Sequence, residues 1–133
     1  SRYAILYIDI DHFKEVNDRW GHLAGDEVLR SVGAGILHAI RPGDGAVRFG
    51  GDEFVVIVGG LHSKEEAHNI AKRVRDAATQ EVSWRGNVLR FTASVGVAYA
   101  REGDASGEML LERADQAMYR AKKRGRDGQI EVD

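Results

Sequence analysis

Residues 48–58 read RFGGDEFVVIV, in which two apolar runs flank a pair of glycines followed by two acids. This pattern predicts a β-hairpin with an incoming strand over 46–49, a turn at the glycines and a buried return strand over 54–58. Glycine accepts a positive φ in such a turn, and it has no Cβ to keep another molecule from the backbone. Because adjacent carboxylates repel each other, Asp52 and Glu53 at the lip of this hairpin favour a bound cation, although two solvated acids after an ordinary turn are the more common case.

The composition limits the class of protein. A chain of 133 residues with 43% hydrophobic and 30% charged residues is typical of one soluble globular domain. The absence of cysteine excludes a disulfide scaffold and thiolate metal sites, and it agrees with a reducing cytoplasm. A net charge of −2 argues against a dedicated nucleic-acid binder, and no apolar run exceeds the length of a strand.

An apolar run over residues 3–11, YAILYIDID, ends in two acids. Because it lacks a polar face, this run predicts a strand that is buried on both sides and therefore central in its sheet. We expect the two acids to point to opposite faces of the strand, so that only one of them faces a given site, and we assign that place to Asp9. Asp11 is expected to serve as the N-cap of the following helix.

The remaining elements follow from apolar spacing, caps and turn residues. Helices are expected over 13–19, 26–40, 63–80 and 106–123, and strands over 81–84, 88–99 and 129–132. Leu37 and Met109 are expected among the inward-facing residues of their helices. Small residues at 94–98 predict that a helix packs closely over that strand.

The resulting order of elements is βααββαββαβ. Hairpins interspersed with helices indicate an α/β, or α+β, sandwich in which helices flank a mixed, largely antiparallel sheet. A doubly wound parallel sheet is not expected, because its strands would be joined by helices throughout.

Two further groups of polar residues stand out, and each has an ordinary structural explanation. Asn17 and Asp26 lie on either side of an expected turn over 21–26, where both residue types commonly cap helices, and His22 lies in the turn itself. Five of the residues in 120–126 are basic, which suits a helix C-terminus and equally a phosphate-binding site.

Several motifs together resemble the GGDEF domain of diguanylate cyclases. They are DIDHFK at 9–14, ND at 17–18, GHLAGD at 21–26, GGDEF at 50–54, SVG at 94–96, ADQAMYRAK at 114–122 and GR at 125–126. The motifs cover nearly the whole chain in the family's order and spacing, so the set is far more specific than a lone GGDEF. The resemblance implies a palm-like sheet, similar to that of nucleotide cyclases and polymerases.

The family's reaction joins two GTP into cyclic di-GMP and releases two pyrophosphates. Since one domain holds one GTP, the resemblance implies that two domains meet face to face. We therefore expect a weakly active monomer that works as a transient homodimer, because proximity of the two substrates is what the dimer supplies.

The resemblance also implies a divalent cation, Mg²⁺ or Mn²⁺, as cofactor. The implied ligands are Asp9, the Ile10 carbonyl and Asp52, with Glu53 beside them. Asp52 is the implied catalytic base, aided by Glu53, and Lys14 would stabilise charge that develops in the transition state.

The substrate-binding residues are assigned by the same resemblance. Asn17 and Asp26 would read the guanine edge, whose N1–H and 2-amino group are donors, with His22 close to the substrate. The groups that would hold the phosphates are the backbone amides of His12, Phe13 and Lys14 and the side chains of Lys122 and Arg126.

Residues 41–44 read RPGD, and they stand at the spacing of the family's RxxD product-inhibition site ahead of the hairpin. Arg41 and Asp44 would bind a guanine of cyclic di-GMP there, and Arg73 is a further candidate contact from another helix. The alternative is structural, because Pro-Gly-Asp commonly ends a helix in a turn.

The chain departs from the family pattern in two places. The family's N-terminal helix, with an LTGLxNR signature, is absent from 1–133, and Asp127 stands where the family usually has Asn. We therefore expect 1–133 to be one GGDEF domain from a longer signalling protein that carries an upstream sensor or regulatory domain. The domain is expected in the cytoplasm, and membrane anchoring of the parent protein stays open.

Two other functions stay open. A receptor that binds a nucleotide or cyclic di-GMP and signals without catalysis is one alternative, but it would have no need of Asp9, Lys14 and an intact GGDEF motif. A nucleic-acid-binding module rests on 120–126 alone, and the net charge and the lack of an aromatic stacking surface argue against it.

Overall fold

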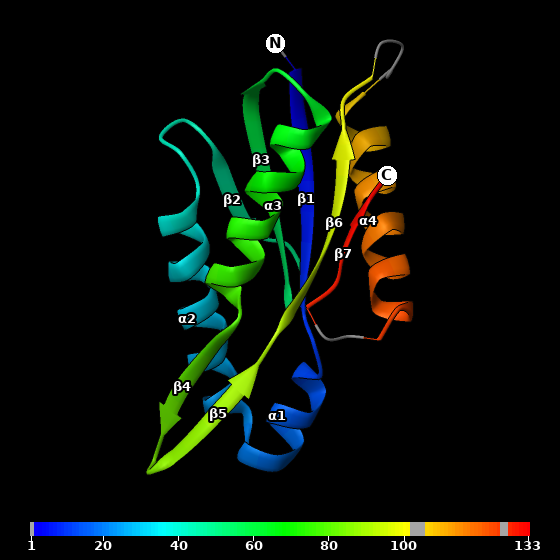
Figure 1. Cartoon of the computed structure of the whole chain (residues 1–133). Coiled ribbons are helices and arrows are strands. Elements are labelled where there is room, and N and C mark those ends of the chain that lie inside the picture. The colour runs from blue at the N-terminus through cyan, green and yellow to red at the C-terminus, as the bar shows by residue number, and fades with distance from the viewer. Residues whose placement is uncertain (1, 102–105, 126–127) are drawn as a thin grey trace.

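The structure, a computed structural model, describes residues 2–101, 106–125 and 128–133. A five-stranded sheet lies in the middle with the strand order β2-β3-β1-β6-β7, and its pairs are antiparallel except the parallel pair β6–β7 (Figure 1). The strands are β1 (Arg2–Ile10), β2 (Gly45–Arg48), β3 (Glu53–Leu61), β6 (Ala93–Tyr99) and β7 (Ile130–Val132). This mixed, mainly antiparallel sheet confirms the predicted fold class.

Helices cover both faces of the sheet. On one face lie α2 (His22–Ala39) and α3 (Lys64–Ala78), and on the other lies α4 (Gly107–Lys123), drawn in orange in Figure 1. The short helix α1 (Phe13–Trp20) follows β1 at one end of the sheet. No helix among the described residues combines the length and the apolarity that crossing a bilayer requires.

Strand β1 is central because its side chains are apolar in both directions. Its even-numbered residues, such as Leu6 and Ile8, are buried among residues of α2 and α3, whereas Ile5 and Tyr7 pack against α4. These four side chains are at most 6% exposed. Burial of one Leu or Ile stabilises a fold by about 1.5–3 kcal/mol, so a strand buried on both faces anchors the whole sheet.

Helix α4 packs closely on β6, as the small residues at 94–98 predict. A Cβ added to Gly96 would overlap the backbone of α4 and would lie 2.7 Å from the Cα of Met118. Ala114, Ala117 and Ala121 keep the same side of the helix small and are fully buried. This close contact brings the C-terminal half of α4 over the end of β1.

The predicted order of elements differs from the observed one at a single point. The strand expected over 88–99 is interrupted at Thr92, so β5 (Asn87–Phe91) pairs with β4 (Gln80–Trp84) in a separate ribbon while β6 joins the main sheet. The interruption allows the chain to leave the ribbon and enter the main sheet beside β1.

Three local expectations are wrong. Leu37 and Met109 are 62% and 46% exposed, because the neighbouring residues Ile36 and Leu110 take the inward positions on their helices. Neither glycine of the hairpin turn has a positive φ. A Cβ at Gly50 would lie 2.5 Å from a carboxylate oxygen of Glu53, so the Glu53 side chain would have to shift.

Candidate functional site

The end of β1 and the turn between β2 and β3 meet at a cavity of about 240 Å³. Pairing of β1 with β3 places Asp9 opposite Glu53, and the Ile10 amide donates to the carbonyl of Asp52 at 3.2 Å. The cavity is lined by Asp9, Ile10, His12, Phe13, Lys14, Asp52, Met118, Tyr119 and Lys122. Seven of the residues assigned from the sequence thus surround one space.

Asp9 is the electrostatic centre of this cavity. Burial raises the pKa of Asp9 to about 7, helped by a hydrogen bond with Asp52 and by the negative charges of Asp52 and Glu53, while Lys122 opposes the rise. Its Oδ1 is buried without a hydrogen-bond partner, and the Lys122 ammonium lies 3.5 Å away. A buried carboxylate oxygen that lacks a partner is costly unless a further positive group can approach it.

The oxygen atoms around this cavity meet part of what a hard divalent cation requires of its ligands. The Asp9 and Asp52 carboxylates and the Ile10 carbonyl are oxygen ligands at one cavity, and the Asp9 Oδ1 has coordination capacity to spare. The described residues include no group of three or more His, Cys, Asp or Glu side chains arranged to hold a metal. The fit therefore rests on two carboxylates and a backbone carbonyl.

Glu53 does not line this cavity, although it lies opposite Asp9 in the sheet. Its Oε1 accepts a hydrogen bond from the Tyr7 hydroxyl at 3.2 Å and lies against Gly50. Burial, followed by the charge of Glu53, raises the pKa of Tyr7 well above its ordinary value, so the hydroxyl keeps its proton and remains a donor. The place of Glu53 as a ligand remains a prediction.

Asp11 is not the N-cap of α1, which corrects the prediction. The N-cap is His12, at φ 59°, and Asp11 is instead 2% exposed in the interior. The expectation that Asp9 and Asp11 point to opposite faces is also wrong. Side chains two residues apart in a strand point the same way, and the Lys122 ammonium lies close to both.

A set of hydrogen bonds surrounds the Asp11 carboxylate. It accepts from the Thr92 hydroxyl at 2.6 Å, the Ser94 hydroxyl at 2.7 Å, the Gly128 amide at 2.9 Å and the Lys122 ammonium at 2.9 Å. Burial alone would raise the pKa of Asp11, but these hydrogen bonds outweigh it and hold that pKa below its ordinary value.

The expected phosphate-binding groups are only partly described. His12, Phe13 and Lys14 line the cavity at the start of α1, whose N-terminus receives no side-chain cap. Such a terminus suits an anion. Arg126, and with it Asp127, lies outside the described residues.

The three residues assigned to guanine lie at the corner between α1 and α2 and do not line the cavity. His22 and Asp26 are exposed, and Asn17 packs its amide oxygen against Gly25, where a Cβ would leave it no room. The turn expected over 21–26 is wrong, since α2 already begins at His22. Gly21, at φ 92°, makes the corner in one residue, so no longer turn is needed.

Arg41 and Asp44 bind each other across the turn that precedes β2. The Arg41 amide and Nε each lie 3.2 Å from Asp44 Oδ2, and the other Asp44 oxygen accepts from the Gly59 amide at 3.2 Å. Arg73 donates to the carbonyl of Ala39 at 3.3 Å, near this turn. The fold thus pairs Arg41 with Asp44 and gives both a structural task, while Arg73 contacts the chain two residues before Arg41.

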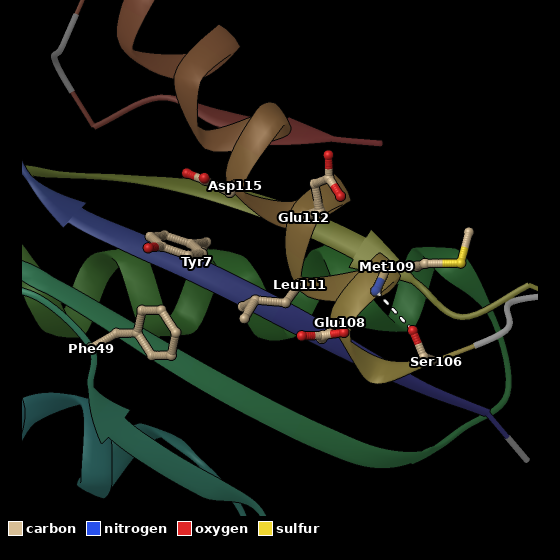
Figure 2. A pocket seen from close by; sticks show the side chains of 8 residues that line it. All are labelled: Tyr7, Phe49, Ser106, Glu108, Met109, Leu111, Glu112 and Asp115. Carbon is tan, nitrogen blue, oxygen red and sulfur yellow. Dashed lines mark hydrogen bonds between the residues drawn. The ribbon is translucent and has the colours of Figure 1, made fainter.

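A larger cavity, of about 460 Å³, lies beside the N-terminal half of α4. Figure 2 shows Tyr7 and Phe49 on the sheet side, with Leu111 and acidic residues of α4 across from them. The two rings meet edge to face with centroids 5.9 Å apart. None of the residues assigned from the sequence lines this cavity, so its size alone does not make it the candidate site.

Five residues around the site were missed by the sequence reasoning: Tyr7, Thr92, Ser94, Met118 and Tyr119. One signal was available, because Ser94 is a polar residue at the head of an otherwise apolar strand. Thr92 gave no such signal, since its partner lies 81 residues away along the chain.

The raised pKa of Asp9 predicts a pH-dependent stability of the metal-free protein. The folded state binds this proton more tightly than the unfolded state, so the free energy of unfolding falls as pH rises from 3.8 towards 7. The loss should amount to a few kcal/mol, because a tenfold change in proton affinity corresponds to about 1.4 kcal/mol and solvent at the partly open cavity screens part of the effect.

Urea unfolding at several pH values, with the variant Asp9→Asn as matched control, measures this loss. The difference in stability between the variant and the parent chain should grow from pH 4 to pH 8. Mg²⁺ should stabilise the parent chain more at pH 8 than at pH 5. A difference that is flat over this range would contradict the burial argument for Asp9.

Comparison with known proteins agrees with the geometry. The family model of the diguanylate cyclase GGDEF domain matches residues 1–128. The chain is 46% identical over 124 residues to diguanylate cyclase DgcP of Pseudomonas aeruginosa and 38% identical over 126 residues to diguanylate cyclase DosC of Escherichia coli. These matches cover 92% and 93% of this chain but only 18% and 27% of the two relatives.

Solved structures give the same answer. The GGDEF domain of PA1120 (YfiN or TpbB) from Pseudomonas aeruginosa superposes with a TM-score of 0.92 at 36% identity, over 98% of this chain and 81% of that one. The GGDEF domain of DgcB from Caulobacter crescentus, solved in complex with c-di-GMP, gives 0.88 at 33% identity, over 99% and 76%. The chain therefore belongs to the GGDEF domain family of the diguanylate cyclases.

Proposed function

We propose that this chain is a diguanylate cyclase, which condenses two GTP into cyclic di-GMP and two pyrophosphates. The observation that carries the proposal is the cavity at the end of β1, where the carboxylates of Asp9 and Asp52 lie beside the ammonium of Lys122. A nucleotidyl transfer needs carboxylates that hold a divalent cation and, beside them, positively charged side chains that bind the triphosphate. The curated relatives named diguanylate cyclases agree with it.

Mg²⁺, or Mn²⁺ in its place, would be held by Asp9, the Ile10 carbonyl and Asp52, with Glu53 as a further candidate. When bound there, the cation supplies neutralisation of the triphosphate and a lower pKa for the attacking 3′-hydroxyl. Asp52 is the candidate acceptor of the hydroxyl proton, since its half-buried carboxylate lines the cavity. The oxygen then bonds to the α-phosphorus of the other GTP as its bond to pyrophosphate breaks.

The chain's cations would hold the rest of the substrate. Lys14 and Lys122 enter the cavity from different helices, so both can contact phosphate oxygens. Asn17 and Asp26, at the corner of α1 and α2, would pair with the donor edge of guanine, which adenine does not offer. Arg126 is proposed as a further phosphate contact from the sequence alone.

The two phosphodiester bonds require two copies of the chain, each presenting its GTP to the other. The specific activity per mole of chain should therefore rise with protein concentration when the chain is incubated with saturating GTP and Mg²⁺. Initial rates across a dilution series, with product separated chromatographically, test this step. A specific activity that is independent of concentration down to the lowest dilution would contradict assembly of the dimer during turnover.

Regulation and location are part of the proposal. The chain covers a minor share of its curated relatives, which supports a longer parent protein with a sensor or regulatory domain. Diguanylate cyclase SiaD was solved in complex with its activator SiaC, so control by a partner occurs in a related structure. We propose that the domain is located in the cytoplasm, where its substrate GTP is available.

Arg41 and Asp44 are proposed to bind cyclic di-GMP as a feedback inhibitor. Replacing Arg41 by Ala should raise the cyclic di-GMP concentration that halves the activity by roughly tenfold or more, because a charge-assisted, two-pronged contact is lost. Inhibition curves at fixed GTP measure it. Glu66→Gln, which removes the charge of a half-buried partner 3.5 Å from Arg41, is the matched control. Equal inhibition of Arg41→Ala and the parent chain would leave the pair with its structural task alone.

A further inference from the structure

Asp11 is a buried carboxylate to which the proposed reaction gives no role. Its side chain has no exposed surface, although an isolated buried charge is strongly unfavourable. The four donors that surround it come from β6 and its approach, from α4 and from the segment before β7. A charge with so many fixed partners is held in one orientation, so it can position another group.

Lys122 is the one of these partners that reaches the cavity. Its side chain is 9% exposed, and its ammonium lies 2.9 Å from Asp11, 3.3 Å from the Ile10 carbonyl and 3.5 Å from Asp9. Asp9 and the Ile10 carbonyl are the proposed ligands of the cation. When they are engaged by a cation, Asp11 is the contact that stays available to Lys122.

We propose that Asp11 is a positioning residue that fixes the Lys122 ammonium at the edge of the cavity, where it meets the phosphates of GTP. The inference rests on the proposed function, because it assumes that Lys122 binds the triphosphate. Asp11 itself touches neither substrate nor cation. Its effect passes entirely through Lys122.

The contacts explain why the position requires a carboxylate. Asp11 Oδ1 accepts from Ser94 and Lys122, and Oδ2 accepts from Thr92 and Gly128. An asparagine would turn its NH₂ group towards one of these pairs. The Ser94 and Thr92 hydroxyls can rotate to accept a hydrogen bond, but the Lys122 ammonium and the Gly128 amide can only donate. Whichever way the asparagine turned, its NH₂ group would therefore face either that ammonium or that amide. The asparagine side chain also lacks the charge that holds Lys122.

A double-mutant cycle in steady-state kinetics tests the inference. The variants are Asp11→Asn, Lys122→Met and the pair together, assayed with GTP and Mg²⁺ on the full chain. Each single variant should raise the KM for GTP by roughly tenfold, and the double variant should rise no further than Lys122→Met alone. Glu65→Gln, at an exposed acid on α3, is the matched control and should leave KM unchanged.

A merely structural role would give different results. Asp11→Asn would then lower the folded fraction and kcat while KM stays constant, or its effect on KM would multiply with that of Lys122→Met; either result overturns the inference. If Asp11→Asn does not fold, Thr92→Val is used instead, because it removes one hydrogen bond to the Asp11 carboxylate and leaves that carboxylate in place. Thr92→Val should raise the KM for GTP by about threefold in the parent chain, and it should not change the KM of a chain that already carries Lys122→Met. The same rise in both backgrounds would overturn the inference.

A separate measurement distinguishes failure of the cyclase proposal from failure of the positioning role of Asp11. If the parent chain makes no cyclic di-GMP, the same cycle is run on the affinity for 3′-deoxy-GTP, which cannot react, by calorimetry. Non-additive losses of affinity would support the positioning role although the cyclase proposal has failed. Additive losses, or no binding of the analogue, would overturn it.

Discussion

Replacing Asp52 by Ala should reduce cyclic di-GMP formation by on the order of 10³-fold or more. Asp52 lines the cavity, its carbonyl accepts a hydrogen bond from the Ile10 amide, and its carboxylate contributes to the raised pKa of Asp9. Truncation keeps the backbone contact and removes a proposed cation ligand together with the candidate base. The variant should therefore have a lower kcat and an unchanged fold.

The Asp52→Ala measurement has an internal check. Because the variant also removes a negative charge beside Asp9, the metal-free chain should unfold at a higher urea concentration than the parent at pH 8. Asp18→Ala, an exposed acid on α1, is the matched control and should keep its activity. Activity above a tenth of the parent level in Asp52→Ala would exclude the assigned role.

Replacing Gly96 by Val should be the most destabilising change considered. A Cβ at this position overlaps backbone atoms of Ala114 and Met118, and backbone atoms cannot rotate away as a side chain can. Helix α4 must then move off β6. We expect the free energy of unfolding to fall by at least about 3 kcal/mol, a large share of the roughly 5–15 kcal/mol that stabilises a typical domain.

The same change should also remove activity from the molecules that remain folded, because α4 carries Lys122 into the cavity. Urea unfolding followed by circular dichroism measures the stability. Gly45→Ala in β2 is the matched control, since a Cβ there meets nothing within 4 Å, and it should unfold like the parent. A Gly96→Val chain with the parent's unfolding midpoint would refute the close contact of α4 with β6.

Those parts of the fold that depend on local patterns were predictable. The apolar run 3–11 is a central strand buried on both faces, and the glycine at position 96 marks the helix crossing. The Ser63 hydroxyl caps α3 by accepting from the Glu66 amide at 3.1 Å, as its sequence pattern indicates. Each of these features is decided by residues close together in the chain.

The role of Asp11 could not be predicted in this way. Its partners Thr92, Ser94 and Gly128 are 81 to 117 residues away, whereas the local pattern predicts only a helix cap. This prediction fails because burial at the end of β1 offers the carboxylate stronger donors than the amides of α1. The grouping of Asp9 with Asp52 was predictable only through the family's motifs, since it depends on the register between two strands.

The break at Thr92 shows a second limit. Residues 88–99 contain no glycine or proline before position 96, so the sequence indicates one strand, yet the chain passes from the ribbon to the main sheet there. The change is imposed by pairing: Ala93 lies opposite Ile10 of β1, and Phe91 lies opposite Gln80 of β4. Pairing partners of this kind are properties of the tertiary fold.

The central claim is that the cavity between β1 and the GGDEF turn makes cyclic di-GMP, and product analysis of a forced dimer tests it most directly. The chain is fused to a dimerising coiled coil, incubated with GTP and Mg²⁺, and the nucleotides are separated chromatographically while pyrophosphate is measured. The account predicts cyclic di-GMP with two pyrophosphates for each molecule formed, and none from the Asp52→Ala fusion. A folded fusion that binds GTP or cyclic di-GMP but forms no product would contradict the account and identify a receptor.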